Sequence, residues 1–150
     1  MNKAIIDTSV LLMPPGRLAA AIADFDEIAI SVATVGEVEH GLLSAGVDWE
    51  SRFRRDLAYR RLLGLFDVLP FDGAAAREYA KLCFLVRQAG RSHRRRAVDL
   101  MIAATASAHG VSLVTANADD LRGAEALVKV VSVAQPEFEA RRGWGGAQQQ

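Results

Sequence analysis

Short apolar runs alternate with longer segments of helical periodicity along most of this 150-residue chain. The apolar runs are too short for helices, which favours buried strands. Strands that alternate with helices form a parallel sheet whose two faces are both covered. The sequence therefore predicts an α/β fold with a central, mostly parallel sheet and helices on both faces. The expected strands span residues 3–7, 27–32, 111–115 and 128–133, and residues 68–71 are expected to form a brief extended segment.

The segments between these runs carry apolar residues at helical spacing. Asp48 and Asp72 stand where two of the helices begin, and aspartate is a favourable N-cap. The expected helices span residues 18–23, 34–43, 48–66, 72–88 and 99–109. The side chains expected to face the core are Trp49, Phe53, Leu57 and Leu62 in the third helix, and Tyr79, Leu82, Cys83 and Val86 in the fourth.

Length and composition limit the classes of protein to which the chain can belong. With 51% hydrophobic residues, we expect one domain over residues 1–135 and a partly disordered C-terminal tail over residues 136–150. The formal net charge of +0 excludes a globally basic nucleic-acid binder but leaves room for a local basic patch. Because Cys83 is alone and no leader or membrane-spanning stretch is evident, we expect a cytoplasmic protein without membrane contact.

Four widely spaced acidic residues, Asp7, Glu37, Asp99 and Asp120, each lie beside an apolar run. Ligands of a parallel sheet bind outside the carboxyl ends of its strands, where Asp7 and Asp120 are expected to lie. Two carboxylates ~4 Å apart repel by about 4 kcal/mol at an effective dielectric of ~20, which a divalent cation would offset. Carboxylate oxygens suit Mg²⁺ or Mn²⁺ better than zinc.

Each of these acids also has an ordinary structural interpretation. Asp7 could close its strand with an Asx-turn. Thr34 and Glu37 have the spacing of a capping box at the start of a helix. Asp99 could be a plain N-cap, and Asp120 could cap a short helical turn.

Four stretches, taken in order, resemble the motifs of PIN-domain nucleases. They are residues 6–11, with the sequence Ile-Asp-Thr-Ser-Val-Leu, followed by residues 30–41, 99–106 and 113–121. The size of the chain and the wording of these motifs are most similar to the VapC toxins of bacterial VapBC toxin–antitoxin modules. The chain departs from the family pattern at Leu121, where phenylalanine is usual, and in the strongly basic residues 92–96.

The resemblance implies a PIN-like fold and a Mg²⁺- or Mn²⁺-dependent endoribonuclease that is the toxin of a type II module. Water activated by the metal would cleave RNA and leave 5′-phosphate and 3′-hydroxyl ends. A cognate VapB-type antitoxin would inhibit the enzyme, and we expect a homodimer. Two alternatives stay open: a catalytically silent PIN-like module that acts through protein binding, and a metal-dependent nuclease or phosphatase on another substrate.

The resemblance also assigns roles to residues of this chain. Its catalytic and metal-binding acids would be Asp7, Glu37, Asp99 and Asp120, with Asp119 as a rival for the fourth position. The polar residues expected to orient the carboxylates or water are Thr8, Ser9, Thr115 and Asn117, together with Asp119.

The basic loop before Asp99 has three possible roles. It could be a solvated linker, a contact for RNA phosphates or a contact for the antitoxin. The possible phosphate contacts are Arg91, Arg94, Arg95 and Arg96. For the antitoxin we also expect an apolar groove between residues 18–23 and the helix that follows Asp48.

Overall fold

A five-stranded parallel sheet forms the centre of the computed structural model, which describes residues 1–44, 46 and 48–134. The expected tail over residues 136–150 lies outside the described residues, so the domain boundary stays a prediction. The strand order is β3-β2-β1-β4-β5, and every pairing is parallel, which confirms the expected sheet. The strands are β1 (Lys3–Ile6), β2 (Glu27–Ser31), β3 (Asp67–Leu69), β4 (Ser112–Thr115) and β5 (Val130–Ser132).

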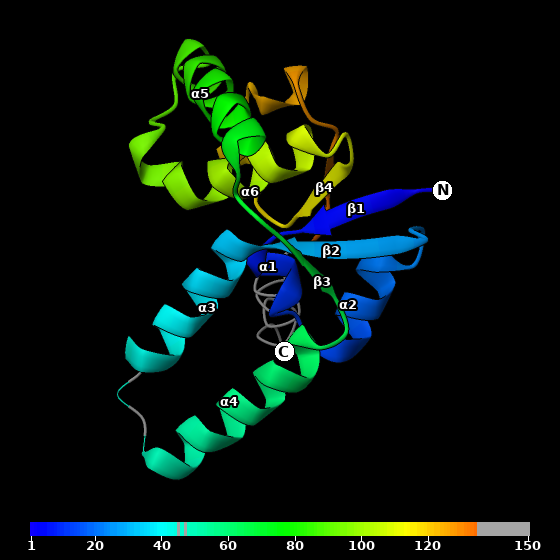
Figure 1. Cartoon of the computed structure of the whole chain (residues 1–150), viewed down its shortest axis with the longest axis vertical. Coiled ribbons are helices and arrows are strands. Elements are labelled where there is room, and N and C mark those ends of the chain that lie inside the picture. Colours follow the sequence, from blue (N-terminus) through cyan, green and yellow to red (C-terminus); the bar gives the residue numbers. More distant parts are fainter. Residues whose placement is uncertain (45, 47, 135–150) are drawn as a thin grey trace, which may run out of the picture.

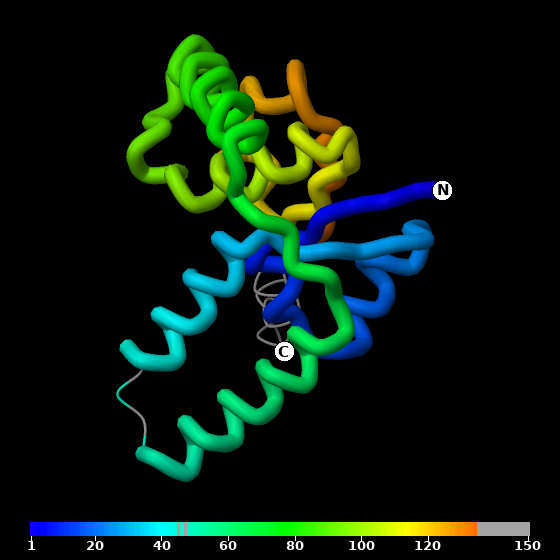
Figure 2. The backbone as a smooth tube through the Cα atoms, viewed as in Figure 1, coloured from blue at the N-terminus to red at the C-terminus, as the bar shows by residue number. Residues whose placement is uncertain are grey.

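Helices cover both faces of this sheet, as expected (Figure 1). The α-helices are α1 (Thr8–Leu11), α2 (Pro15–Ile22), α3 (Val32–Ser44), α4 (Trp49–Leu63), α5 (Gly73–Gln88) and α6 (Ala97–Ala108). Short 3₁₀ turns are η1 (Arg94–Arg96), η2 (Ala118–Leu121) and η3 (Ala124–Ala126). In Figure 2, α3 leads away from the sheet and α4 returns to it.

The strands contribute side chains to two separate hydrophobic cores, because successive side chains of a strand point to opposite faces of the sheet. Ile5 of β1 packs with Leu82 of α5 and Leu100 of α6. Its neighbour Ile6 packs on the other side with residues that include Val10 of α1 and Val38 of α3. Both isoleucines are fully buried, so the central strand is anchored from both faces.

Local hydrogen bonds set where the helices begin. Asp48 and Asp72 are the predicted N-caps of α4 and α5, and their carboxylates accept bonds from Ser51 N at 2.9 Å and Ala75 N at 3.0 Å. By contrast, α3 begins two residues earlier than predicted. Ser31 Oγ accepts a bond from the backbone N–H of residue 33 at 3.1 Å, which lets the helix start directly after β2.

The predicted inward face of α4 is wrong for its first half. Trp49, Phe53 and Leu57 are 76%, 62% and 40% exposed, whereas Tyr59 is only 5% exposed. Only the C-terminal half of α4 reaches the core beside α1 and α2. The predicted inward face of α5 is confirmed, because Leu82 and Val86 are buried and Tyr79 and Cys83 are partly buried against the core.

The direction in which strands are added to the sheet reverses at β1. From β1 the chain builds β2 and β3 on one side, then returns to add β4 and β5 on the other. Such a reversal of winding is where parallel α/β sheets bind ligands. No helix within the described residues is long and apolar enough to cross a lipid bilayer.

Candidate active site

Asp7 is fixed at the carboxyl end of β1 by several hydrogen bonds. Its Oδ1 accepts from Ser9 Oγ at 2.6 Å and from Val10 N at 3.1 Å, which makes it the N-cap of α1. Its Oδ2 accepts from the hydroxyl of Thr115, the last residue of β4. With only 5% of its surface exposed, Asp7 therefore joins β1, α1 and β4 at one point.

Two of the polar residues expected to orient the carboxylates, Ser9 and Thr115, donate hydrogen bonds to Asp7. Ser9 Oγ, besides donating to Asp7, accepts from Ala116 N at 3.1 Å. Thr115 Oγ1, besides donating to Asp7, accepts from Asn117 N at 3.0 Å. Each hydroxyl is thus held from both sides, and this restricts the orientation of the Asp7 carboxylate.

Glu37 approaches the same region from α3. It accepts a hydrogen bond from the Thr8 hydroxyl, which also lies 3.4 Å from the hydroxyl of Thr34. The capping-box interpretation is wrong, because Thr34 is fully buried inside α3, two residues after the helix begins at Val32. Glu37 is an exposed side chain.

Asp99 lies in the first turn of α6, and its interpretation as an N-cap is wrong because the helix begins at Ala97. Within the described residues, its carboxylate receives no hydrogen bond. Burial raises the pKa of Asp99 from 3.8 to about 6, helped by the negative charges of Asp7, Glu37 and Asp120. Three acids from other parts of the chain therefore lie close enough to Asp99 to raise its pKa.

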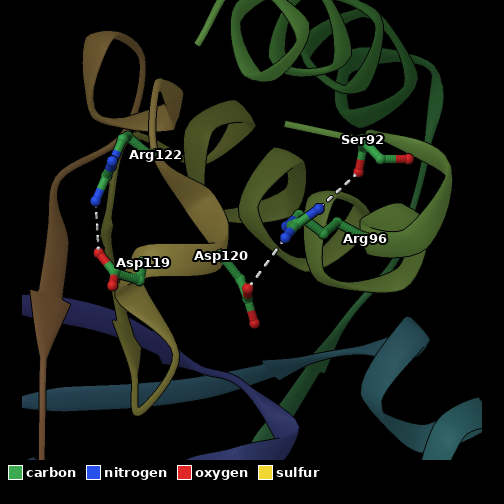
Figure 3. A network of polar contacts seen from close by, with 5 residues as sticks. All are labelled: Ser92, Arg96, Asp119, Asp120 and Arg122. Carbon is green, nitrogen blue, oxygen red and sulfur yellow. Dashed lines mark hydrogen bonds and ion pairs between the residues drawn. The ribbon is translucent and has the colours of Figure 1, made fainter. Parts of the chain in front are cut away.

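The two neighbouring acids of η2 face different surroundings, as Figure 3 shows. Asp120 Oδ1 lies 3.2 Å from Arg96 Nη2, and the charge of Asp120 acts on Asp99. Asp119 Oδ1 instead lies 3.1 Å from Arg122 Nη2, and its side chain is 85% exposed. The geometry thus brings Asp120 into the acidic cluster and leaves Asp119 outside it.

The four arginines expected as phosphate contacts do not behave as one group. Arg94 and Arg95 are exposed, and Arg91 is half-buried. The side chain of Arg96 is only 15% exposed and is engaged by Asp120 and by the carbonyl of Ser92. Arg96 therefore faces the acidic cluster rather than open solvent, unlike Arg94 and Arg95.

The cluster does not form a ready-made cage for a metal. Among the described residues, no three Asp, Glu, His or Cys side chains are placed to hold one ion together. This spacing still fits Mg²⁺, which keeps several water ligands and is often held by only one or two carboxylates. The carboxylate chemistry and the excess of negative charge around Asp99 thus suit a hydrated hard cation.

Sequence reasoning missed two elements of the site. The helix α1 is a single turn, too short for hydrophobic periodicity to reveal, yet it carries Thr8 and Ser9. The inward direction of Arg96 was also missed. Its position three residues before Asp99, about one helical turn, was a signal that could have suggested contact with the acids.

Comparison with known proteins identifies the family. Residues 4–126 match the PIN domain family. The chain is 39% identical over 105 residues to Ribonuclease VapC8 of Mycobacterium tuberculosis, across 68% of this chain and 88% of that protein. This chain belongs to the VapC family of PIN-domain ribonucleases. It is similarly related to the VapC-family member Ribonuclease VapC5 of the same species, with 33% identity over 116 residues, 77% of this chain and 83% of that protein.

A solved structure also supports the VapC assignment. It is a member of the VapBC family of toxin–antitoxin systems, VapBC-5 from Mycobacterium tuberculosis. The similarity has a TM-score of 0.71 at 29% identity, and covers 89% of this chain and 99% of that chain. The resemblance found in the four sequence motifs is thereby confirmed.

Proposed function

We propose that this protein is a Mg²⁺- or Mn²⁺-dependent endoribonuclease and the toxin of a type II toxin–antitoxin module. The observation that carries the proposal is the gathering of Asp7, Glu37 and Asp120 around the half-buried Asp99. Such a concentration of negative charge is costly without a counter-ion. Membership of the VapC family, whose named relatives are ribonucleases, favours RNA as the substrate.

In the proposed mechanism the four acids hold the cation, partly through water. A bound Mg²⁺ would stabilise charge on the scissile phosphate and lower the pKa of a bound water. Ser9 and Thr115 keep both oxygens of Asp7 oriented, and Thr8 holds Glu37 at the rim. The cation and water together make a histidine base unnecessary.

The RNA backbone would approach over the basic loop. Arg94 and Arg95 are exposed on η1, directly before α6 and its Asp99. Arginine contacts with phosphates contribute affinity and salt dependence without selecting a sequence. These two residues are therefore the phosphate contacts that we propose, with Arg91 as a more buried neighbour.

Cleavage of matched RNA and DNA strands tests the proposed reaction. The purified protein is incubated with each labelled strand in EDTA, Mg²⁺ or Mn²⁺, beside the Asp99→Asn variant. We expect cleavage of RNA alone, only with a metal and only by the wild type, with 5′-phosphate ends. No cleavage of any RNA would favour a silent binding module, and preferential attack on DNA or a phosphate monoester would favour another substrate.

We further propose that a VapB-type antitoxin covers apolar grooves on both sides of α4. The expected groove against α2 has a volume of about 550 Å³ and is lined by Leu18, Ile22 and Leu62 among others. A second groove of about 510 Å³ is bounded by Thr8 and Glu37 at its active-site end. An extended or helical apolar segment across α4 would therefore reach the acids.

Assembly can be tested directly. Co-expression with the neighbouring small reading frame should yield a complex in which RNA cleavage is suppressed, and size exclusion with light scattering should give the mass of a toxin homodimer plus antitoxin. A monomer that is unaffected by that neighbour and harmless to its host would contradict the toxin proposal without touching the nuclease chemistry. The cytoplasmic location expected from the single cysteine stays a prediction.

A further inference from the structure

Arg96 links the loop before α6 to the fourth acid of the cluster. Its Nη1 donates to the carbonyl of Ser92 at 3.0 Å, and its Nη2 donates to Asp120 Oδ1 at 3.2 Å. Figure 3 shows the guanidinium between these two partners, with Asp120 turned toward it. One side chain thus connects η1 to η2 across 24 residues of sequence.

The burial of Arg96 separates this ion pair from an ordinary surface contact. Its side chain is 15% exposed, whereas Arg122, which pairs with the adjacent Asp119, is 57% exposed. The Nε of Arg96 is buried and has no hydrogen-bond partner within the described residues. Leaving a buried donor unpaired is unfavourable, so Arg96 is held there by charge rather than by a complete set of hydrogen bonds.

The charge of Arg96 acts on more than Asp120. It opposes the rise in the pKa of Asp99, which burial chiefly causes and the other three acids increase. A guanidinium stays charged at any pH relevant to a protein, so this compensation is permanent. In the metal-free protein Arg96 therefore does part of what a bound cation would do.

We propose that Arg96 is a resident counter-cation of the acidic cluster, which holds Asp120 in the metal-free protein and competes with an incoming divalent ion for that carboxylate. The inference rests on the proposed metal-dependent function. It makes Arg96 a positioning residue and not a contact for RNA. It also means that the metal must share Asp120 with a fixed positive charge, which weakens binding of the metal.

Titration of Mn²⁺ into Arg96→Met, followed by calorimetry, tests the competition. Removing a positive charge close to the ion should tighten Mn²⁺ binding about tenfold. Arg96→Lys keeps the charge and should bind Mn²⁺ as the wild type does. Arg122→Met removes an equivalent charge from the exposed pair and is the matched control, with no change expected; Arg96→Gln provides a second neutral variant in case the methionine variant does not fold.

Three results of this titration would overturn the inference. Unchanged affinity in the neutral variants would show that Arg96 does not compete, and weaker binding would show that it orients Asp120 for the metal. In both cases the proposed metal site itself stands. Failure of the wild type to bind Mn²⁺ would overturn the proposed function, and the competition with it.

A double-mutant cycle in EDTA tests whether Arg96 holds Asp120 when no metal is bound. Arg96→Met should lower the melting temperature by about 3 °C, since a partly buried carboxylate loses its partner. In an Asp120→Asn background the same change should have a clearly smaller effect. Additive effects of the two substitutions would contradict the counter-cation role. The control is the exposed pair of Arg122 and Asp119, for which the effects of the two substitutions should be additive.

Discussion

At the scale of single residues, Asp99 shows how a proposed metal-binding acid can oppose stability. It sits in the first turn of α6, where the positive end of the helix dipole favours a negative charge. Burial and three neighbouring acids outweigh that benefit and raise its pKa to about 6. The metal-free protein therefore bears a cost at neutral pH for keeping this side chain ionised.

Asp99→Asn should remove this cost. Because the folded pKa of about 6 lies above the ordinary value of 3.8, the stability from protonated Asp99 is complete below pH 4 and is lost as the pH rises through 6. At pH 7.5 in EDTA we expect the variant to be more stable by roughly 1 kcal/mol, a value reduced for partial solvent exposure, with the difference vanishing at pH 4. Urea unfolding at both pH values measures it, and a strongly destabilised variant at pH 7.5 would contradict the prediction.

The two acids of η2 should differ in activity. Asp120 acts on Asp99, whereas Asp119 points toward Arg122 and solvent. We expect Asp120→Asn to reduce RNA cleavage by about a hundredfold and Asp119→Asn by about threefold at most. Initial rates on a labelled RNA decide between them, after circular dichroism has shown that both variants fold. Equal losses, or a greater loss from Asp119→Asn, would reverse the assignment.

At the scale of secondary-structure elements, the site depends on how β1 and β4 are tied together. Both strands end at the same edge of the sheet, and the Thr115 hydroxyl joins them through Asp7. The single-turn helix α1 then leads Thr8 and Ser9 back over that edge. A short element too local to predict from periodicity thus carries two of the residues that orient the acids.

Thr115→Val tests this connection. The substitution keeps the shape of a fully buried side chain but removes the hydroxyl that donates to Oδ2 of Asp7 and accepts from the N–H of Asn117. We expect a loss of about 1–3 kcal/mol in the free energy of unfolding, measured with urea. Thr115→Ser retains the hydroxyl and is the matched control, so its loss should be smaller. A Thr115→Val protein that is as stable as the wild type would contradict the role of the hydroxyl.

At the scale of the whole molecule, the exposed half of α4 presents an apolar surface that suits the proposed antitoxin. Trp49, Phe53 and Leu57 recur at four-residue spacing and so lie on one side of the helix, all substantially exposed. Large apolar side chains gathered on a surface are typical of a contact with another chain. The two grooves beside α4 are lined instead by residues of its C-terminal half, such as Ala58 and Leu62.

Replacing both aromatic residues should separate assembly from folding. In the double variant that carries both Trp49→Ser and Phe53→Ser, we expect the free energy of unfolding of the isolated protein to stay within about 0.5 kcal/mol of the wild type. The same protein should bind the co-expressed antitoxin, or its own second copy, more weakly in light scattering. Leu82→Ala, which is fully buried in α5, is the contrasting control with an expected loss of about 2–5 kcal/mol. A large loss of stability in the serine variant would show that these aromatic residues pack within the monomer.

The sequence by itself determined the features that depend on local interactions. The strands, the helices, and the caps Asp48 and Asp72 follow from hydrophobic spacing and from bonds between residues a few positions apart. The four motifs likewise indicated the family, because their residues and order are recorded in the chain itself. Hydrophobic spacing does not by itself predict the residue at which a helix begins, since a side chain such as Ser31 can extend a helix beyond its periodic segment.

Only the tertiary structure decided which side chains meet. It placed Asp120 rather than Asp119 at the cluster, turned Arg96 away from solvent and left the start of α4 exposed. Each outcome depends on a partner or a covering layer that is distant in sequence, and hydrophobic periodicity carries no information about such partners. The pKa of Asp99 also depends on the tertiary structure. Nothing in the sequence distinguishes Asp99 from an ordinary aspartate, and its pKa is raised by burial and by acids from three other segments.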